Sequence, residues 1–223
     1  MTRLRLFADN ADSQEVGPLL SLGIVRGVTT NPTILRAAGA SLAKAPQLYA
    51  EWVGLGADEV FFQAVGGTTD AYLASGRQIA ELGDRVVVKL PATRAGFVAA
   101  AELVKAGIRT LITAVYDPAQ VAIAIAMGAR YVAPYLGRLD DSGRNGLDVI
   151  AAMQRLVDGS PTAILAASIR SSSAITELAL IGVTHLTVAP RVLLDSMEHS
   201  DSDAAAALFE THTRTRHEHP QVV

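Results

Sequence analysis

Eight short runs of apolar and β-branched residues, spread along the 223-residue chain, constrain the fold most. Gly, Pro or polar residues follow each run, and a stretch with helical periodicity comes next. The runs cover residues 4–8, 27–29, 60–65, 86–90, 110–115, 131–134, 163–167 and 185–189. They are mostly apolar throughout, which is typical of parallel strands covered by helices. Eight strands alternating with eight helices predict a (β/α)8 TIM barrel, an α/β fold.

The residues between the runs support a closed barrel. Several helical stretches end in a glycine at the place where a helix C-cap favours one, namely Gly23, Gly107, Gly128 and Gly182. The rival fold, an open doubly wound sheet, usually has a Gly-rich phosphate turn after its first strand, and "LFADNADS" has none. We therefore expect residues 1–223 to form a single barrel domain, with an extra C-terminal helix at about 202–217.

Composition narrows the classes of function. The chain has no cysteine, which excludes disulfides, thiolate zinc sites and a cysteine nucleophile. Its formal net charge of −3 gives no electrostatic footprint for nucleic acid. The longest apolar run, residues 121–127, is far too short to span a membrane, and the N-terminus lacks the apolar core of a signal peptide. We expect a cytoplasmic protein that binds neither nucleic acid nor membrane.

Lys89 is the most informative polar residue, because it lies inside the apolar run "VVVKL". A structural lysine there would extend its ammonium to water or pair with a carboxylate such as Asp9. An ordinary lysine is neutral only about four times in ten thousand at pH 7. Burial lowers the pKa of an amine by up to roughly 3–5 units, and the free amine then attacks a carbonyl to form a Schiff base. The sequence therefore favours Lys89 as an amine nucleophile.

Other polar residues follow the predicted strands at the end where barrel enzymes place their chemistry. Tyr135 is a candidate proton donor, Gln63 and Thr113 can hold the water of imine formation, and Asp9 and Asn31 can bind substrate hydroxyls. Each has a structural alternative. Asp9, Asn31 and Thr113 could cap helices or tie loops, and Gln63 and Thr113 could be hydrogen-bonded filling residues in the interior. Their occurrence together at matching positions favours a site.

An anion site is predicted where the seventh strand turns into a helix. "ASIRSSS" places Ser168, Arg170 and backbone N–H groups at this turn, where the helix dipole also attracts a negative charge. Arg138, after the sixth strand, completes a candidate phosphate site. The structural alternative for Arg138 is a solvated ion pair with Asp140 or Asp141.

The histidines do not form a pattern that predicts a metal site. His185 stands alone in the eighth run and is predicted to be structural. His212, His217 and His219 lie near the C-terminus without a ligand set at catalytic spacing. We expect no metal and no cofactor.

Five motifs, in the right order from Leu6 to about Ala189, resemble those of the small transaldolases and fructose-6-phosphate aldolases. They are "GVTTNPTIL", "VVVKLPAT", "TLITAVYDPAQ", "YVAPYLGRLDDSGRNG" and "ILAASIRS". The resemblance implies a (β/α)8 barrel that forms a ring-like homo-oligomer, a pentamer or decamer, and acts on sugar phosphates and dihydroxyacetone. It implies that Lys89 is the Schiff-base lysine. It also carries over the family's substrate and phosphate residues to Asp9, Asn31, Arg138, Ser168 and Arg170. Thr29, at the end of the second strand, is a further candidate for substrate binding.

Two positions distinguish the branches of this family. Transaldolases carry glutamate on the third strand and phenylalanine on the sixth, whereas the aldolases carry glutamine and tyrosine, as this chain does at Gln63 and Tyr135. However, "YLGRLDDSGRNGLD" and "AASIRS" are closer to the small transaldolases. The prediction is a class I aldolase that cleaves or forms fructose 6-phosphate, with dihydroxyacetone and glyceraldehyde 3-phosphate as the partners. The alternatives are a transaldolase that transfers dihydroxyacetone between sugar phosphates and a non-catalytic sugar-phosphate-binding barrel.

Overall fold

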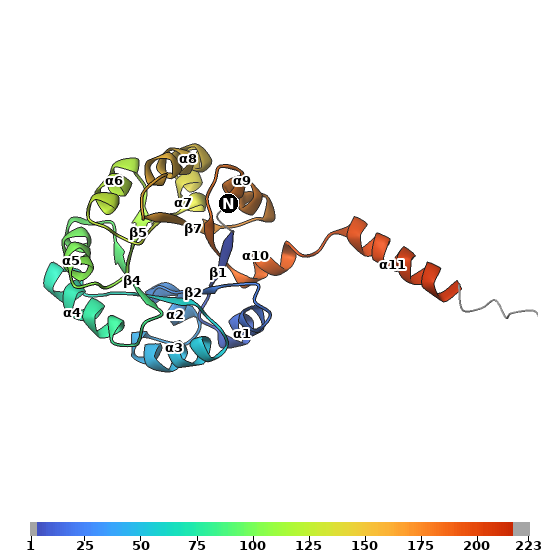
Figure 1. The fold of residues 1–223 in the computed structure, drawn as a ribbon, viewed down its shortest axis with the longest axis horizontal. Helices are drawn as coiled ribbons and strands as arrows, with labels where there is room; N and C mark the ends of the chain where they lie inside the picture. Colours follow the sequence, from blue (N-terminus) through green and yellow to red (C-terminus); the bar gives the residue numbers. More distant parts are fainter. Residues whose placement is uncertain (1–3, 216–223) are drawn as a thin grey trace, which may run out of the picture.

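A computed structural model describes residues 4–215, and its eight parallel strands close into a barrel in the order β1 to β8 (Figure 1). The strands are β1 (Arg5–Asp9), β2 (Gly27–Thr29), β3 (Glu59–Gln63), β4 (Val86–Pro91), β5 (Thr110–Val115), β6 (Tyr131–Pro134), β7 (Ala163–Ile169) and β8 (His185–Val188). All eight predicted runs form strands, with boundaries shifted by up to two residues. The pairing of β1 with β8 closes the sheet and excludes the open doubly wound alternative.

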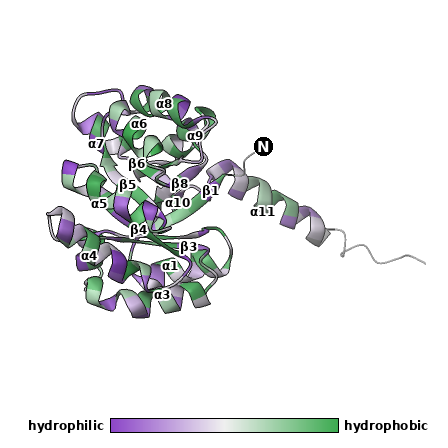
Figure 2. Ribbon diagram, turned by 60° about the vertical axis from the view of Figure 1, so that its left-hand side comes forward, coloured by the Kyte–Doolittle hydropathy of each residue, from purple (hydrophilic) through white to green (hydrophobic). Residues whose placement is uncertain are grey.

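Helices surround the barrel, except for the last one, α11, which extends away from it (Figure 1). They are α1 (Ser13–Ser21), α2 (Pro32–Ala37), η1 (Leu42–Lys44, a 3-10 turn), α3 (Ala45–Gly54), α4 (Thr69–Ala80), α5 (Arg94–Lys105), α6 (Pro118–Ala126), α7 (Leu136–Asp141), α8 (Gly146–Val157), α9 (Ser172–Leu180), α10 (Pro190–Asp195) and α11 (Ser200–Thr215). Figure 2 shows apolar strands inside a shell of helices that alternate between polar and apolar turns. Among the described residues, no helix is both long and apolar enough to cross a membrane.

The predicted glycine C-caps are confirmed. Gly23, Gly107, Gly128 and Gly182 have φ angles of 69°, 77°, 82° and 90°. This left-handed conformation ends a helix at no steric cost only when no Cβ is present. The four positions therefore reverse the chain after α1, α5, α6 and α9 and return it to the next strand.

Strand alternation sorts the side chains of each strand between the helices and the barrel lumen. In β4, Val86 and Val88 belong to the apolar layer between sheet and helices, whereas Val87 belongs to a separate apolar cluster in the lumen. Lys89 follows Val87 by two residues and lies on the same lumen face. The lumen cluster also contains Phe7, Phe61, Leu111, Tyr131, Ala133 and Leu165. This cluster forms the floor beneath the polar side chains at the C-terminal ends of the strands.

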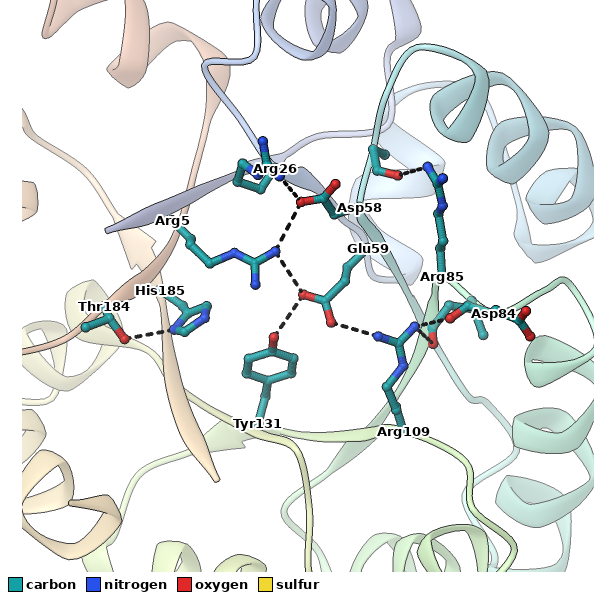
Figure 3. Close-up of polar contacts among 12 residues, drawn as sticks. Arg5, Arg26, Asp58, Glu59, Asp84, Arg85, Arg109, Tyr131, Thr184 and His185 are labelled. Carbon is teal, nitrogen blue, oxygen red and sulfur yellow. Dashed lines mark hydrogen bonds and ion pairs between the residues drawn. The ribbon is translucent and has the colours of Figure 1, made fainter. Parts of the chain in front are cut away.

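A polar network occupies the opposite, N-terminal end of the lumen (Figure 3). The buried carboxylate of Glu59 accepts hydrogen bonds from Tyr131 at 2.8 Å and from Arg109 at 3.1 Å, and Arg5 lies 3.9 Å away. His185 lies nearby, with its Nδ1 atom 2.9 Å from the hydroxyl of Thr184. This arrangement agrees with the structural role predicted for His185. At the rim of the network, Asp58 pairs with Arg5 and Arg26.

The predicted C-terminal helix is observed as α11, which extends away from the barrel (Figure 1). It begins at Ser200 and ends at Thr215, so the last two residues of the predicted range lie outside the described part of the chain. Leu208 and Phe209 on this helix are exposed. His212 lies in α11, and the predictions for His217 and His219 also fall outside the described residues.

Candidate active site

A cavity of about 480 Å³ opens at the C-terminal end of the barrel. Eight of the ten predicted site residues line it, namely Asp9, Asn31, Gln63, Lys89, Thr113, Tyr135, Arg138 and Ser168. Most come from the strands β1 to β7 or from the residues that directly follow them, and Arg138 comes from helix α7, as expected for a barrel that carries its chemistry on one face. The parallel arrangement of the strands brings these residues together, because the C-terminal ends of all eight strands meet at the same edge of the barrel.

Lys89 projects into this cavity from β4 and is only 4% exposed. Its Nζ atom donates a hydrogen bond to the carbonyl oxygen of Thr30 at 2.8 Å. That carbonyl is well fixed, since the backbone N–H and the hydroxyl of Thr30 both donate to Phe61. Burial lowers the pKa of Lys89, and attraction to Asp9 opposes this shift. A neutral amine keeps its bond to Thr30 and still has a lone pair for a carbonyl carbon.

Asp9 ends β1 and is the only carboxylate among the residues that line the cavity. Its Oδ1 atom accepts a hydrogen bond from the Thr29 hydroxyl at 2.6 Å. Burial raises the pKa of this carboxyl group, while Lys89 and the Thr29 hydrogen bond lower it. The structural alternative, a helix cap, does not apply, because Asp12 caps α1. Asp9 can therefore take up a proton from a bound hydroxyl group.

Tyr135 follows β6, and its phenol lies 2.8 Å from the hydroxyl of Thr113 on β5. Burial raises the pKa of the phenol, partly offset by the Thr113 hydrogen bond. Tyr135 therefore stays protonated at neutral pH and is equipped to donate a proton. The guanidinium of Arg138, which also lines the cavity, lies over the tyrosine ring, 5.4 Å from its centroid.

Asn31 caps a helix and also lies in the cavity wall. It is the N-cap of α2, where its Oδ1 atom accepts a hydrogen bond from the backbone N–H of Ile34 at 3.0 Å, and it also lines the cavity. The capping bond fixes the side chain. Its amide nitrogen can then donate to a substrate oxygen without further loss of side-chain entropy.

Two residues in the cavity wall have a strained backbone. Ala114 and Ser168 have φ angles of 57° and 58°, in the left-handed region that disfavours residues with a Cβ. Each lies at a shift in strand register, between β5 and β6 and between β7 and β8 respectively. Such strain concentrates at functional sites. Here it accompanies the change of strand direction that brings both residues to the cavity.

Two predicted substrate-binding residues do not line the cavity. Thr29 is fully buried behind Asp9, so it acts on the carboxylate rather than on a ligand. Arg170 forms a two-point ion pair with Asp141, with distances of 2.7 and 2.6 Å. The alternative of an Arg138–Asp141 ion pair is therefore replaced by an Arg170–Asp141 pair. Arg170 packs close over Gly137, where an added Cβ would lie 2.6 Å from its Nε atom.

Several wall residues were not predicted. They are Pro32, Thr33, Ile34, Pro91, Ala114, Ala133, Leu165, Ala167 and Thr187. Most are apolar or small and carry no chemical signal. Thr187 is the exception, because alternation along β8 places it on the lumen face two residues after His185, and that pattern is readable in the sequence. The described residues contain no group of three or more histidines and carboxylates close enough to hold a metal ion.

Known proteins are similar to this chain over most of its length. The family model described as "Transaldolase/Fructose-6-phosphate aldolase" matches residues 6–223. A relative from Caulobacter vibrioides named "Probable transaldolase" is 34% identical over 92% of this chain and 94% of its own length. A second relative of that name, from Phenylobacterium zucineum, is 36% identical over 88% of this chain and 90% of its own.

Among solved structures, dihydrodipicolinate synthase from Rhodopseudomonas palustris is similar, with a TM-score of 0.62. The two sequences are 16% identical, and the match covers 99% of this chain and 83% of the synthase chain. At this identity the likeness concerns the barrel fold alone. The family match and the curated relatives cover nearly the whole chain. The chain therefore belongs to the transaldolase and fructose-6-phosphate aldolase family.

Proposed function

We propose that this protein is a class I aldolase that cleaves fructose 6-phosphate to dihydroxyacetone and glyceraldehyde 3-phosphate, and catalyses the reverse condensation. The observation that carries the proposal is the buried Lys89 amine, with its lowered pKa, in one cavity with Gln63 and Tyr135. Lys89 provides the nucleophile common to the whole family. Gln63 and Tyr135 favour the aldolase branch over the transaldolase branch.

Imine formation starts with attack by the Lys89 amine on the C2 carbonyl carbon of the open-chain sugar. The carbinolamine then loses its hydroxyl as water, for which Tyr135 supplies the proton. Gln63 and Thr113 line the cavity beside these groups and can hold that water. The resulting iminium carries the positive charge that later accepts the electrons of the broken bond.

Cleavage needs a base for the C4 hydroxyl, and Asp9 is the carboxylate in the cavity wall. As Asp9 removes this proton, the C3–C4 bond breaks and its electrons enter the iminium to form an enamine. Glyceraldehyde 3-phosphate leaves from the side of Arg138 and Ser168, which line the cavity and match the phosphate residues of the resemblance. Arg170 is paired with Asp141 at the end of α7, the helix that carries Arg138, so a role for Arg170 at the phosphate requires it to exchange Asp141 for the phosphate group.

The fate of the enamine separates the two activities. Protonation of its carbon by Tyr135, followed by hydrolysis of the imine, releases dihydroxyacetone. An enamine that is not protonated instead waits for a second aldehyde and transfers its three carbons. Because burial keeps the phenol protonated, Tyr135 favours release.

Transaldolase activity is the second candidate, because the curated relatives carry the name "Probable transaldolase". Incubation with fructose 6-phosphate alone tests the choice, since only an aldolase releases free dihydroxyacetone steadily. Rapid transfer to erythrose 4-phosphate with negligible release would assign the protein to the transaldolase branch. A non-catalytic barrel would give neither product, and borohydride reduction in the presence of fructose 6-phosphate would leave Lys89 unmodified.

Self-association is part of the same proposal. Helix α11 extends from the barrel, and its side chains Leu208 and Phe209 are 53% and 65% exposed (Figure 1). Burying such side chains against a second copy would stabilise an assembly through the hydrophobic effect. Light scattering of the full chain tests it, and a mass equal to one chain at micromolar concentration would contradict it.

A further inference from the structure

A chain of hydrogen bonds connects β8 to the carboxylate of Asp9. The Thr29 hydroxyl lies 2.6 Å from Asp9 Oδ1 and 2.5 Å from the hydroxyl of Thr187. β2 and β8 flank β1 on its two sides in the closed barrel. The two threonines therefore meet on the lumen side of β1, although they are 158 positions apart in sequence. Both are almost completely buried.

The chemistry of a hydroxyl group fixes the direction of this chain. Thr29 has one hydroxyl proton, and it donates that proton to Asp9. The contact between the two threonines therefore requires Thr187 to donate and Thr29 to accept. Thr187 donates its only hydroxyl proton to Thr29 and therefore cannot donate a hydrogen bond to a substrate. Although it lines the cavity, its structural effect is directed at Thr29.

We propose that Thr187 is a positioning residue for the reaction, which orients the Thr29 hydroxyl and through it holds Asp9 Oδ1, so that Oδ2 faces the substrate as the base. This inference rests on the proposed function, in which Asp9 deprotonates the C4 hydroxyl. Hydrogen bonds in a chain polarise and strengthen one another. Loss of the Thr187 donor therefore weakens the Thr29 bond to Asp9 and frees the carboxylate to rotate.

The pKa of Asp9 is the quantity that the test measures, and it depends on the charged and titratable groups that face this residue. Lys89 on β4 stabilises the carboxylate and so lowers the pKa of Asp9. Tyr135, after β6, interacts electrostatically with Asp9, and Arg138 lies over the Tyr135 ring. None of these groups changes when Thr187 is replaced. Since the Thr29 bond lowers the pKa of Asp9, a weaker bond raises it, and the base is then lost at a higher pH.

The test is the pH profile of cleavage for Thr187→Val, which keeps the shape of the side chain and removes its hydroxyl. We expect the acid limb of kcat/KM to move up by about half to one pH unit. We expect kcat to fall about tenfold while KM changes little. Thr187→Ser restores the donor and the wild-type acid limb. Thr187→Ala carries the same expectation as valine and replaces it if circular dichroism shows that the valine variant is unfolded.

A matched control exists in the same barrel. Thr110 is a fully buried β5 threonine whose hydroxyl has no hydrogen-bond partner among the described residues. Thr110→Val makes the same chemical change away from the cavity, so its pH profile should equal that of the wild type. An equal shift in Thr110→Val and Thr187→Val would show a general packing effect and overturn the positioning role.

A double-mutant cycle with Thr29→Val adds a second criterion. Thr29→Val already removes the partner of Asp9, so the added Thr187→Val should change the acid limb no further, and additive shifts would overturn the proposal. Borohydride trapping in every variant keeps this result separate from the proposed function. No Lys89 adduct in the wild type would reject the Schiff-base mechanism itself. An adduct together with an unchanged Thr187→Val profile would reject only the role of Thr187.

Discussion

Lys89 and Asp9 are electrostatically coupled across the cavity, yet burial outweighs their attraction. The carboxylate raises the pKa of the amine and the ammonium lowers the pKa of the carboxyl group, but desolvation is the larger cause for each residue and shifts each pKa towards the neutral form. The barrel thus favours an uncharged amine and makes the carboxylate a better base. Both properties serve Schiff-base chemistry.

Replacing Lys89 with methionine separates chemistry from stability. Lys89→Met removes the nucleophile, so cleavage should fall by about a thousandfold or more and the borohydride adduct should disappear. The free energy of unfolding should rise by about 1 kcal/mol, because an apolar chain of similar volume replaces a costly buried amine. Denaturant titration measures the second effect. A destabilised Lys89→Met would show instead that Lys89 holds the fold through its bond to Thr30.

Tyr135→Phe tests the proton donor. Without the phenol, the enamine is protonated slowly, so release of dihydroxyacetone should fall about tenfold to a hundredfold, and transfer to erythrose 4-phosphate should fall less. The ratio of the two rates, measured with one enzyme preparation, is the readout. Equal losses in release and transfer would contradict the assigned role.

Tyr131→Phe is the matched control, since Tyr131 begins β6, the strand that Tyr135 follows, and lies at the other end of the lumen. Its hydroxyl donates to the buried Glu59 rather than to any residue of the cavity. Loss of that bond should lower the free energy of unfolding by about 1–3 kcal/mol and leave the ratio of release to transfer unchanged.

His185 should make the fold sensitive to acid. Burial, and then the nearby Arg5 and Arg130, lower its pKa from 6.5 to about 4. Between these values the unfolded chain binds a proton that the folded chain does not. Stability is therefore fully present above pH 6.5 and is lost as the pH falls towards 4, by roughly 2–3 kcal/mol.

The comparison of wild type with His185→Gln isolates this contribution, because the carboxyl groups of the chain titrate equally in both proteins. Glutamine cannot take up a proton in this range, so the variant should lose less stability between pH 7 and pH 4.5. Parallel stability curves would show that His185 is not the sensitive group.

Glu59→Gln tests the network at the N-terminal end of the lumen (Figure 3). The change leaves Arg109 and Arg5 without the carboxylate that they share. Both arginines are partly exposed, which screens the loss, so we expect a cost of about 2 kcal/mol in the free energy of unfolding. The kinetics of the folded fraction should not change, because the apolar lumen cluster separates this network from the cavity. A large fall in kcat without a fall in stability would contradict this separation.

The sequence predicted much of the site because two patterns can be recognised within short segments: the recurring apolar runs and the alternation of side chains along each strand. The eight runs place Gln63, Lys89 and Thr113 on strands, and strand alternation places Lys89 on the lumen face with Val87. Residues at the C-terminal ends of parallel strands must then converge. The family motifs added the chemistry, and the closed barrel confirmed the fold.

Contacts between distant segments were decided only in three dimensions. Nothing local distinguishes the exposed Arg170, which pairs with Asp141, from Arg138, which lies over Tyr135 and lines the cavity. Likewise, Thr29 was predicted to bind substrate, but its hydroxyl is taken up by Asp9 and Thr187. The reason is physical: alternation fixes which face a side chain takes, whereas barrel closure fixes which strands become neighbours and which hydroxyls meet across β1.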